Sequence, residues 1–201
     1  MATNDEEDGG LEEALIDEEE ITYPIFQEIP DGISEDWTHG VLIGGMATET
    51  SDIAVAEGYW WAAEKLIEPA LRSREPWLYA YPILFLVRHS LELYLKAIVQ
   101  PKKLDHDLRP LIDKLDRILE RRFHQKIPPE LRTDLEMLAT IDPNGMSSRY
   151  TTVKSKNGVS WAFVPGEFFV PLENLRRRMA MIFEGLQNVD RRLRGLPVSR
   201  R

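Results

Sequence analysis

The feature that most constrains this chain is one fifteen-residue segment, Phe85–Val99, which is apolar around most of its circumference when drawn as a helix. At about 100° per residue, the charged side chains Arg88, Glu92 and Lys96 fall on one side of that helix, and His89 falls beside them. A helix that is otherwise apolar is buried at the centre of a bundle. The segment therefore predicts a central helix that is crossed by one narrow polar stripe.

Charged side chains on a buried helix are costly unless they pair with one another or face a cleft. Arg88, Glu92 and Lys96 are four residues apart, which is the spacing of ion pairs along a helix, so a self-contained ladder satisfies the pattern. A functional cleft lined by the same side chains satisfies it equally, because perturbed charged groups cluster at functional sites. The sequence leaves both interpretations open.

Apolar residues at steps of three and four indicate further helices on both sides of this segment. An earlier helix begins near Thr50, Ser51 and Asp52, any of which can cap it, and Pro69 is expected to end or kink it. The central helix begins at Trp77 or at Pro82. The remaining expectations are a helix capped by Asp107 that contains Pro110, a shorter helix over Pro129–Ile141, and a last helix with one apolar seam from Leu172 to Leu193.

The segment Thr151–Val164 has a different pattern, because β-favouring residues flank the dipeptide Asn157-Gly158. This dipeptide suits the two positive-φ positions of a type I′ turn. We therefore expect a small β-hairpin before the last helix. The expected fold class is all-α in the main: an up-down helical bundle that also has this small hairpin and an acidic N-terminal arm.

Charge divides the chain into an acidic arm and a basic body. Residues Met1–His39 hold 14 of the 34 acidic residues and no Lys or Arg, so the other 20 acidic residues stand against all 25 basic ones. The first half of this arm has too few apolar side chains to offset the entropy of ordering it. We expect a partly disordered arm over residues 1–39 and one helical domain over residues 40–201, since this length suits a single core.

The composition also limits the classes of site. The chain has no Cys, which excludes disulfides and thiolate metal sites and favours a reducing, cytoplasmic setting. No uncharged apolar run approaches the roughly 18 residues of a membrane span, so no membrane association is expected. No phosphate-binding Gly-rich loop and no two-His metal motif on one helix are present, so we expect neither a cofactor nor a metal.

Three motifs follow one another along the body of the chain: RHSLELYLKAIV at Arg88–Val99, HDLRPLIDKL at His106–Leu115 and SSRY at Ser147–Tyr150. Together they resemble the HEPN superfamily, whose members are small helical bundles with an E-x-x-x-K-A helix, a His-Asp-Leu helix start and an Arg-Tyr pair. The resemblance covers about residues 50–195. It rests on the order and spacing of the motifs, because each motif alone has low specificity.

The resemblance implies a metal-independent ribonuclease, of the kind found among toxins of toxin-antitoxin systems and antiviral effectors, that acts as a homodimer with its site at the interface. Such chemistry needs a base for the 2′-hydroxyl proton and a cation for the charge on the phosphate, which are roles of His and Arg. The implied catalytic residues are Arg88, His89, Glu92, Lys96 and Arg149, and the implied substrate-binding residues are His106 and Tyr150.

The chain departs from the pattern of the active members, in which His follows Arg after four to six residues. No His follows Arg88 or Arg149 at this distance. Arg117 and His124 have the spacing, but one such match is expected by chance, and the surrounding DRILERRFHQK is typical of a solvated helix end. The alternatives are a non-catalytic HEPN-like module that binds RNA, a nucleotide or a cognate protein partner, and an accessory bundle whose stripe is only a buried ion network.

Overall fold

The computed structural model describes residues 51–102, 105–143, 145, 152–154, 160–162 and 168–197. All of them belong to one unit of the chain, Thr50–Arg201. Several predictions lie outside the described residues: the acidic arm, the domain boundary after His39, the turn at Asn157-Gly158, and the candidate residues Arg149 and Tyr150.

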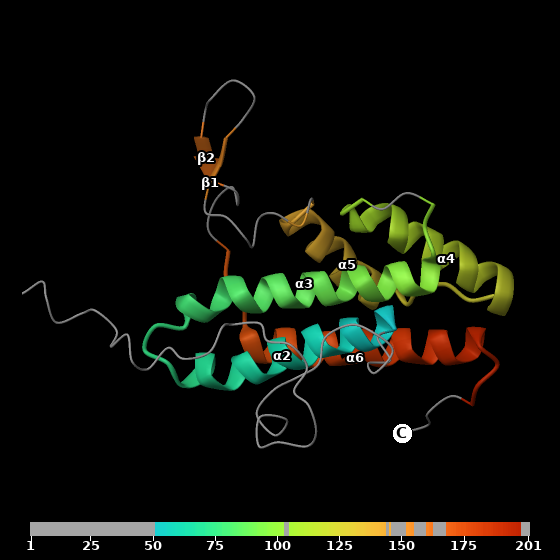
Figure 1. The fold of residues 1–201 in the computed structure, drawn as a ribbon, viewed down its shortest axis with the longest axis horizontal. Helices are drawn as coiled ribbons and strands as arrows, with labels where there is room; N and C mark the ends of the chain where they lie inside the picture. Colours follow the sequence, from blue (N-terminus) through green and yellow to red (C-terminus); the bar gives the residue numbers. More distant parts are fainter. Residues whose placement is uncertain are drawn as a thin grey trace, which may run out of the picture. The chain divides into compact units, whose positions relative to one another are not determined.

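Helices make up most of the described structure, which confirms the mainly α class (Figure 1). Within the described residues, none of them is both long and apolar enough to cross a membrane. The helices are α2 (Asp52–Arg72), α3 (Trp77–Val99), α4 (Leu108–Phe123), α5 (Pro129–Ile141) and α6 (Leu172–Leu193).

Helix α2 begins as its sequence predicts and ends later. The Ser51 hydroxyl accepts a hydrogen bond from the Ala54 amide at 3.1 Å, which caps the first turn. Of the two alternatives for Pro69, the one in which it ends the helix is wrong, because the helix continues to Arg72. Proline removes one amide donor, and this loss is tolerated here because less than one turn follows it.

Helix α3 begins at Trp77, the earlier of the two predicted starts, and it carries Pro82 in its second turn. Its last turn closes at Gln100, where the backbone is left-handed with φ 46° and the amide donates to the Lys96 carbonyl at 2.8 Å. This left-handed residue ends the helix and turns the chain away from the axis of α3.

The core lies around α3, which packs against α2, α4 and α6. This confirms that the apolar segment is a central helix. Trp60 of α2 stacks on Phe183 of α6 with their rings 5.1 Å apart, so those two helices also meet in the core. The buried apolar residues of α3 are Ile83, Val87, Leu91, Tyr94, Leu95 and Val99.

Two short strands lie within the segment for which the sequence predicts a hairpin. They are β1 (Thr152–Lys154) and β2 (Ser160–Ala162), and they pair antiparallel with Val153 opposite Trp161. Each strand has three residues, so the sheet is a small addition to a helical fold.

The simple up-down order fails between α3 and α4, because these two helices run in the same direction. Arg88, in the middle of α3, donates to the carbonyl of His106 just before α4 begins. Further along both helices, Lys114 of α4 donates to the carbonyl of Gln100 at the end of α3. The chain must therefore return along α3 by about 16 Å before α4 starts. The bond from Arg88 holds the start of α4 in that place.

Candidate functional site

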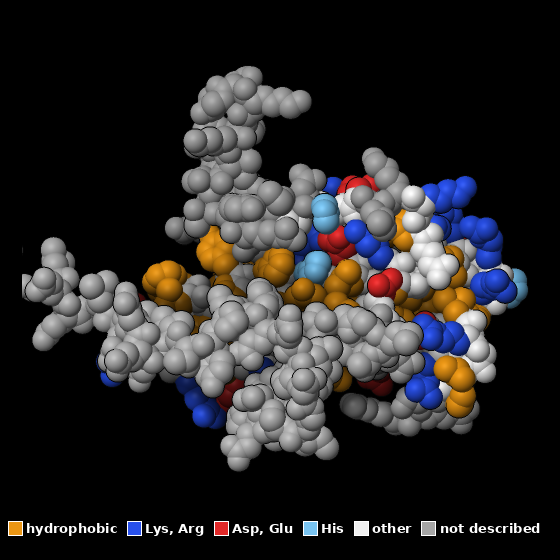
Figure 2. Space-filling view, in the orientation of Figure 1, with side chains coloured by type: hydrophobic (Ala, Val, Ile, Leu, Met, Phe, Trp, Pro, Cys, Tyr) orange, Lys and Arg blue, Asp and Glu red, His pale blue; other side chains and the backbone are white. Residues whose placement is uncertain are grey.

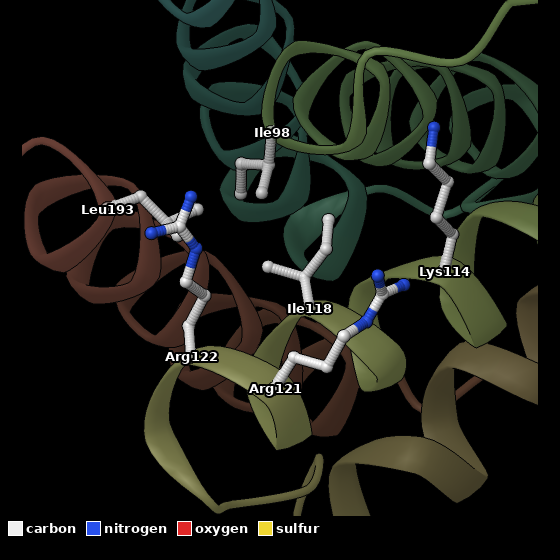
Figure 3. A pocket seen from close by; sticks show the side chains of 6 residues that line it. All are labelled: Ile98, Lys114, Ile118, Arg121, Arg122 and Leu193. Carbon is white, nitrogen blue, oxygen red and sulfur yellow. The ribbon is translucent and has the colours of Figure 1, made fainter.

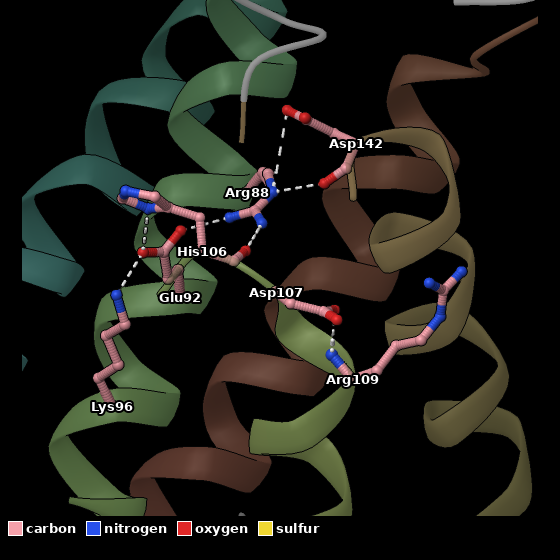
Figure 4. A network of polar contacts seen from close by, with 7 residues as sticks. All are labelled: Arg88, Glu92, Lys96, His106, Asp107, Arg109 and Asp142. Atoms are coloured by element: carbon pink, nitrogen blue, oxygen red, sulfur yellow. Dashed lines mark hydrogen bonds and ion pairs between the residues drawn. The ribbon is translucent and has the colours of Figure 1, made fainter. Parts of the chain in front are cut away.

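The polar stripe of α3 is centred on Arg88, whose side chain is only 3% exposed. Its guanidinium donates in three directions, as Figure 4 shows. Nη1 donates to Oε2 of Glu92 at 2.5 Å, Nε donates to the carbonyl of Asp142 at 2.9 Å, and Nη2 donates to the carbonyl of His106. The planar fork of arginine suits this task, because its donors point outward in fixed directions.

These three bonds join three parts of the fold. Glu92 lies one turn further along α3, His106 precedes α4, and Asp142 follows α5. The Asp142 carboxylate adds a second, longer approach, with Oδ2 3.8 Å from Nε of Arg88. Arg88 thus acts as a buried clamp that ties the start of α4 and the end of α5 to the middle of α3.

Glu92 is the second centre of the network. In addition to the bond from Arg88, its Oε1 accepts from Nζ of Lys96 at 2.6 Å and contacts Nδ1 of His106 at 2.9 Å. Burial by itself would raise the pKa of Glu92, but the hydrogen bond from Lys96, the charges of Arg88 and Lys96, and the hydrogen bond from His106 outweigh it. The pKa of Glu92 therefore lies below its ordinary value, and the carboxylate stays ionised at neutral pH.

His106 is the part of the network that reaches solvent, with 58% of its side chain exposed. An ionised carboxylate only accepts hydrogen bonds, so Nδ1 must carry the hydrogen that joins it to Glu92. In the neutral ring, Nε2 is then the nitrogen that can accept a proton. This is the arrangement of a general base held in orientation by a carboxylate.

Asp107 and Arg109 position the backbone beside His106. The Asp107 carboxylate accepts from the Arg109 amide at 3.0 Å and caps α4, as the sequence predicts. The Arg109 side chain extends away from the buried network in Figure 4. Its Nη2 lies 3.3 Å from the Thr140 hydroxyl on α5. Arg109 is thus an exposed cation close to the site, whereas Arg88 is buried within the site.

Gly145 and Asp142 are site residues that the sequence interpretation missed. Gly145 is buried with φ +68°, and a β-carbon built on it would lie 3.5 Å from Cζ of Arg88. That distance is an ordinary contact, so the backbone conformation, more than space, favours glycine here. The available signal was the turn-forming sequence Asp142-Pro143-Asn144-Gly145, which indicates a tight loop but not what it covers.

His89, a predicted catalytic residue, makes two aromatic contacts. Its ring meets Tyr59 of α2 edge-on at 4.5 Å and stacks on Phe85 at 5.5 Å. These contacts make it part of the packing between α2 and α3. Arg117 and His124, which share the Arg-to-His spacing, are both exposed, and His124 is the left-handed C-cap of α4 with φ 54°.

Of the five predicted site residues that the structure describes, it brings together four. Arg88, Glu92 and Lys96 form the predicted four-residue ladder, and His106 joins it from the start of α4. In the part of the chain that the structure describes, no group of three or more His, Asp or Glu side chains is placed to hold a metal ion.

Comparison with known proteins finds no matching family model, no matching curated protein and no matching solved structure. The resemblance to the HEPN superfamily therefore stays a prediction from the sequence motifs.

Proposed function

We propose that this protein is a non-catalytic, HEPN-like helical module that acts by binding a partner. The observation that carries the proposal is the sealing of the polar stripe: the side chains of Arg88 and Glu92 are each 3% exposed and are already paired with each other. A phosphate contact or a general base must be able to touch its substrate. The stripe supports a role in holding the fold together.

The energies favour this structural role for Arg88. Hydrogen bonds to charged groups contribute about 1.5–3 kcal/mol each, and removing one partner of a buried ion pair costs about 3–5 kcal/mol. To reach a substrate phosphate, Arg88 would have to leave Glu92 and two backbone carbonyls at once. A single phosphate contact offsets only part of that loss, so Arg88 keeps its bonds to Glu92 and to the two carbonyls.

Incubation of the purified full chain with tRNA and with total RNA tests the proposal. A non-catalytic module leaves both RNAs at their full length over the same period as a buffer control. Cleavage above that control would contradict the proposal if it is lost in His106→Ala, at the site, and kept in His124→Ala, away from it.

A metal-independent endoribonuclease is the second candidate, and one observation favours it. His106 presents an exposed imidazole whose Nδ1 is held by the ionised Glu92, as a general base requires. The homodimer and the setting in antiviral defence or a toxin-antitoxin system belong to this candidate and stay predictions. If it is correct, RNA cleavage is lost in His106→Ala and kept in His124→Ala, which removes an exposed imidazole from the other end of α4.

A further inference from the structure

The opposite end of α4 contains an open pocket of about 380 Å³. Figure 3 shows it where the last turns of α3, α4 and α6 come together. This volume is within the range of sites that hold a ligand or the anchoring side chains of a partner. Three aliphatic and three cationic residues line it: Ile98, Ile118, Leu193, Lys114, Arg121 and Arg122.

The charges of α4 are sorted between two faces. At about 100° per residue, Lys114, Arg121 and Arg122 all lie within about 60° of Ile118, on the side of the pocket. The acidic residues of the same stretch, Asp113, Asp116 and Glu120, lie on the opposite side by the same count.

These acidic residues are engaged away from the pocket. Arg132 of α5 pairs with Asp113 at 2.7 Å and with Asp116 at 2.8 Å. Glu120 pairs with Lys126 at 3.6 Å. The acidic residues of α4 therefore have their ion-pair partners away from the pocket, while its cationic face borders the pocket.

Within the described residues, no acidic side chain pairs with the three cations of the pocket. Lys114 donates to the carbonyl of Gln100 at 3.1 Å, and Nε of Arg121 donates to the carbonyl of Arg117 at 3.3 Å. Three helix C-termini lie here, and each carries roughly half a negative charge. Three full positive charges exceed these partial charges, so the rim keeps a positive potential. In the view of Figure 2, Lys and Arg side chains gather at this end of the helices.

We propose that this pocket binds an acidic, amphipathic peptide segment of a partner protein. The inference rests on the proposed function, because it names the partner class of the binding module. Lys114 and Arg121 are seven residues apart on one helix, which separates their backbones by about 10 Å. Each cation can therefore hold a carboxylate of its own. A peptide can place carboxylates on these cations and aliphatic side chains on the floor between them.

The floor of the pocket favours a peptide over single-stranded nucleic acid. Proteins that hold unpaired bases stack them on aromatic rings, whereas Ile98, Ile118 and Leu193 are aliphatic. The nearby ring of Phe123 is already covered by Arg192, whose Cζ lies 3.9 Å from the ring centroid. Aliphatic side chains at helical spacing, flanked by Glu, match such a floor as an amphipathic helix matches a groove.

Fluorescence anisotropy with the full chain tests this proposal. The probe is a fluorescein-labelled peptide of about 15 residues, or four helical turns, with Leu at steps of three and four and Glu elsewhere. The double variant Arg121→Glu/Arg122→Glu should weaken its binding about tenfold or more, because attraction becomes repulsion at the rim. The matched variant Arg74→Glu/Arg177→Glu changes the net charge equally at exposed positions outside the pocket, and should weaken binding less than about twofold.

Two further ligands complete the test. A peptide with every Leu replaced by Ser keeps the charge and should bind less tightly, since it has nothing to place on the aliphatic floor. The proposal is overturned if the Leu peptide does not bind, if the Ser peptide binds equally well, or if both double variants lose binding to the same extent. It is also overturned if single-stranded RNA binds more tightly than the peptide and is lost in Arg121→Glu/Arg122→Glu.

RNA cleavage measured on the same preparations separates this inference from the proposed function. Cleavage that depends on His106 would overturn the non-catalytic function while leaving the peptide result as measured. Failure of the peptide to bind, with RNA left intact, would remove this partner class and leave the non-catalytic function standing.

Discussion

The charged side chains near the two ends of α4 differ in whether they are buried and paired. At its start, Arg88, Glu92 and Lys96 meet His106 in a network whose two central side chains are buried and paired with each other. From its middle to its end, Lys114, Arg121 and Arg122 border an open pocket and have no acidic partner among the described residues. One end of α4 thus meets a buried network of paired charges, and the other borders a pocket lined by cations without acidic partners.

The difference indicates which end is available for function. Buried charges that satisfy one another contribute to the fold, and their removal leaves a partner buried without its counter-charge. Cations that only border a pocket contribute little to stability and remain available to a ligand. We therefore expect substitutions at the start of α4 to change stability, and substitutions at its end to change binding.

Arg88→Ala should have the largest effect, a loss of about 3–5 kcal/mol in the free energy of unfolding. The substitution removes one of the three partners of the Glu92 carboxylate and leaves two backbone carbonyls without their donor. Urea denaturation of the variant measures the loss. Arg109→Ala, at an exposed position of the first turn of α4, is the control and should change stability by less than about 0.5 kcal/mol. Equal effects would show that the start of α4 is not a closed network.

Acid should weaken the closed network through Glu92. Its pKa is lowered from the ordinary value of 4.5, so the folded state favours the ionised carboxylate. That stability is fully present above the ordinary value and is lost as the pH falls toward the pKa of the folded state. One proton accounts for at most about 1.4 kcal/mol per pH unit. Urea denaturation between neutral pH and pH 3 should show a steeper loss in the unmodified protein than in Glu92→Gln.

The control for this experiment is Glu120→Gln, which removes an exposed carboxylate that lies 3.6 Å from Lys126. It should keep the acid-dependent loss of the unmodified protein, because surface pairs contribute little. If Glu120→Gln flattens the profile as much as Glu92→Gln does, the acid response comes from general surface charge and not from the network.

Two glycine substitutions test how the closed network is covered. Gly145→Ala should lower stability by about 1–2 kcal/mol, because its φ of +68° is strained for any residue with a side chain. Gly58→Ala lies within α2 with open space around it and should raise stability by up to about 1 kcal/mol. Thermal unfolding of both variants gives the comparison. A gain in Gly145→Ala would mean that the loop over Arg88 does not need this conformation.

The closed network was predictable from the sequence in the part that lies along one helix. The four-residue spacing of Arg88, Glu92 and Lys96 indicated the ladder, and the structure confirms it with distances of 2.5 Å and 2.6 Å. The His-Asp-Leu motif marked His106 as a site residue, but the backbone bonds of Arg88 beyond α3 were not predictable. Arg88 bonds to the backbone carbonyls of Asp142 and His106, and every residue type has such a carbonyl, so no sequence pattern indicates these two bonds.

His89 and the pocket show the same limit. Helical periodicity placed His89 beside the polar stripe, but its contacts are decided by Tyr59, which α2 brings to it. Likewise, the cationic face of α4 can be read from spacing alone. The meeting of α3, α4 and α6 at that face depends on α4 running in the same direction as α3, which follows from the position of His106 and not from any local pattern.

The smallest expected effect on stability belongs to the open end of α4. Arg121→Ala/Arg122→Ala should change the free energy of unfolding by less than about 1 kcal/mol, measured by urea denaturation beside Arg88→Ala. The variant loses two favourable charges at a helix C-terminus, but Ala gains in helix propensity and the repulsion between Arg117 and Arg121 disappears. A loss as large as that of Arg88→Ala would mean that both ends of α4 hold the fold, and a binding role for the pocket would lose its physical basis. A small change in the free energy of unfolding, together with weaker peptide binding, would show that the start of α4 stabilises the fold and that its end binds a partner.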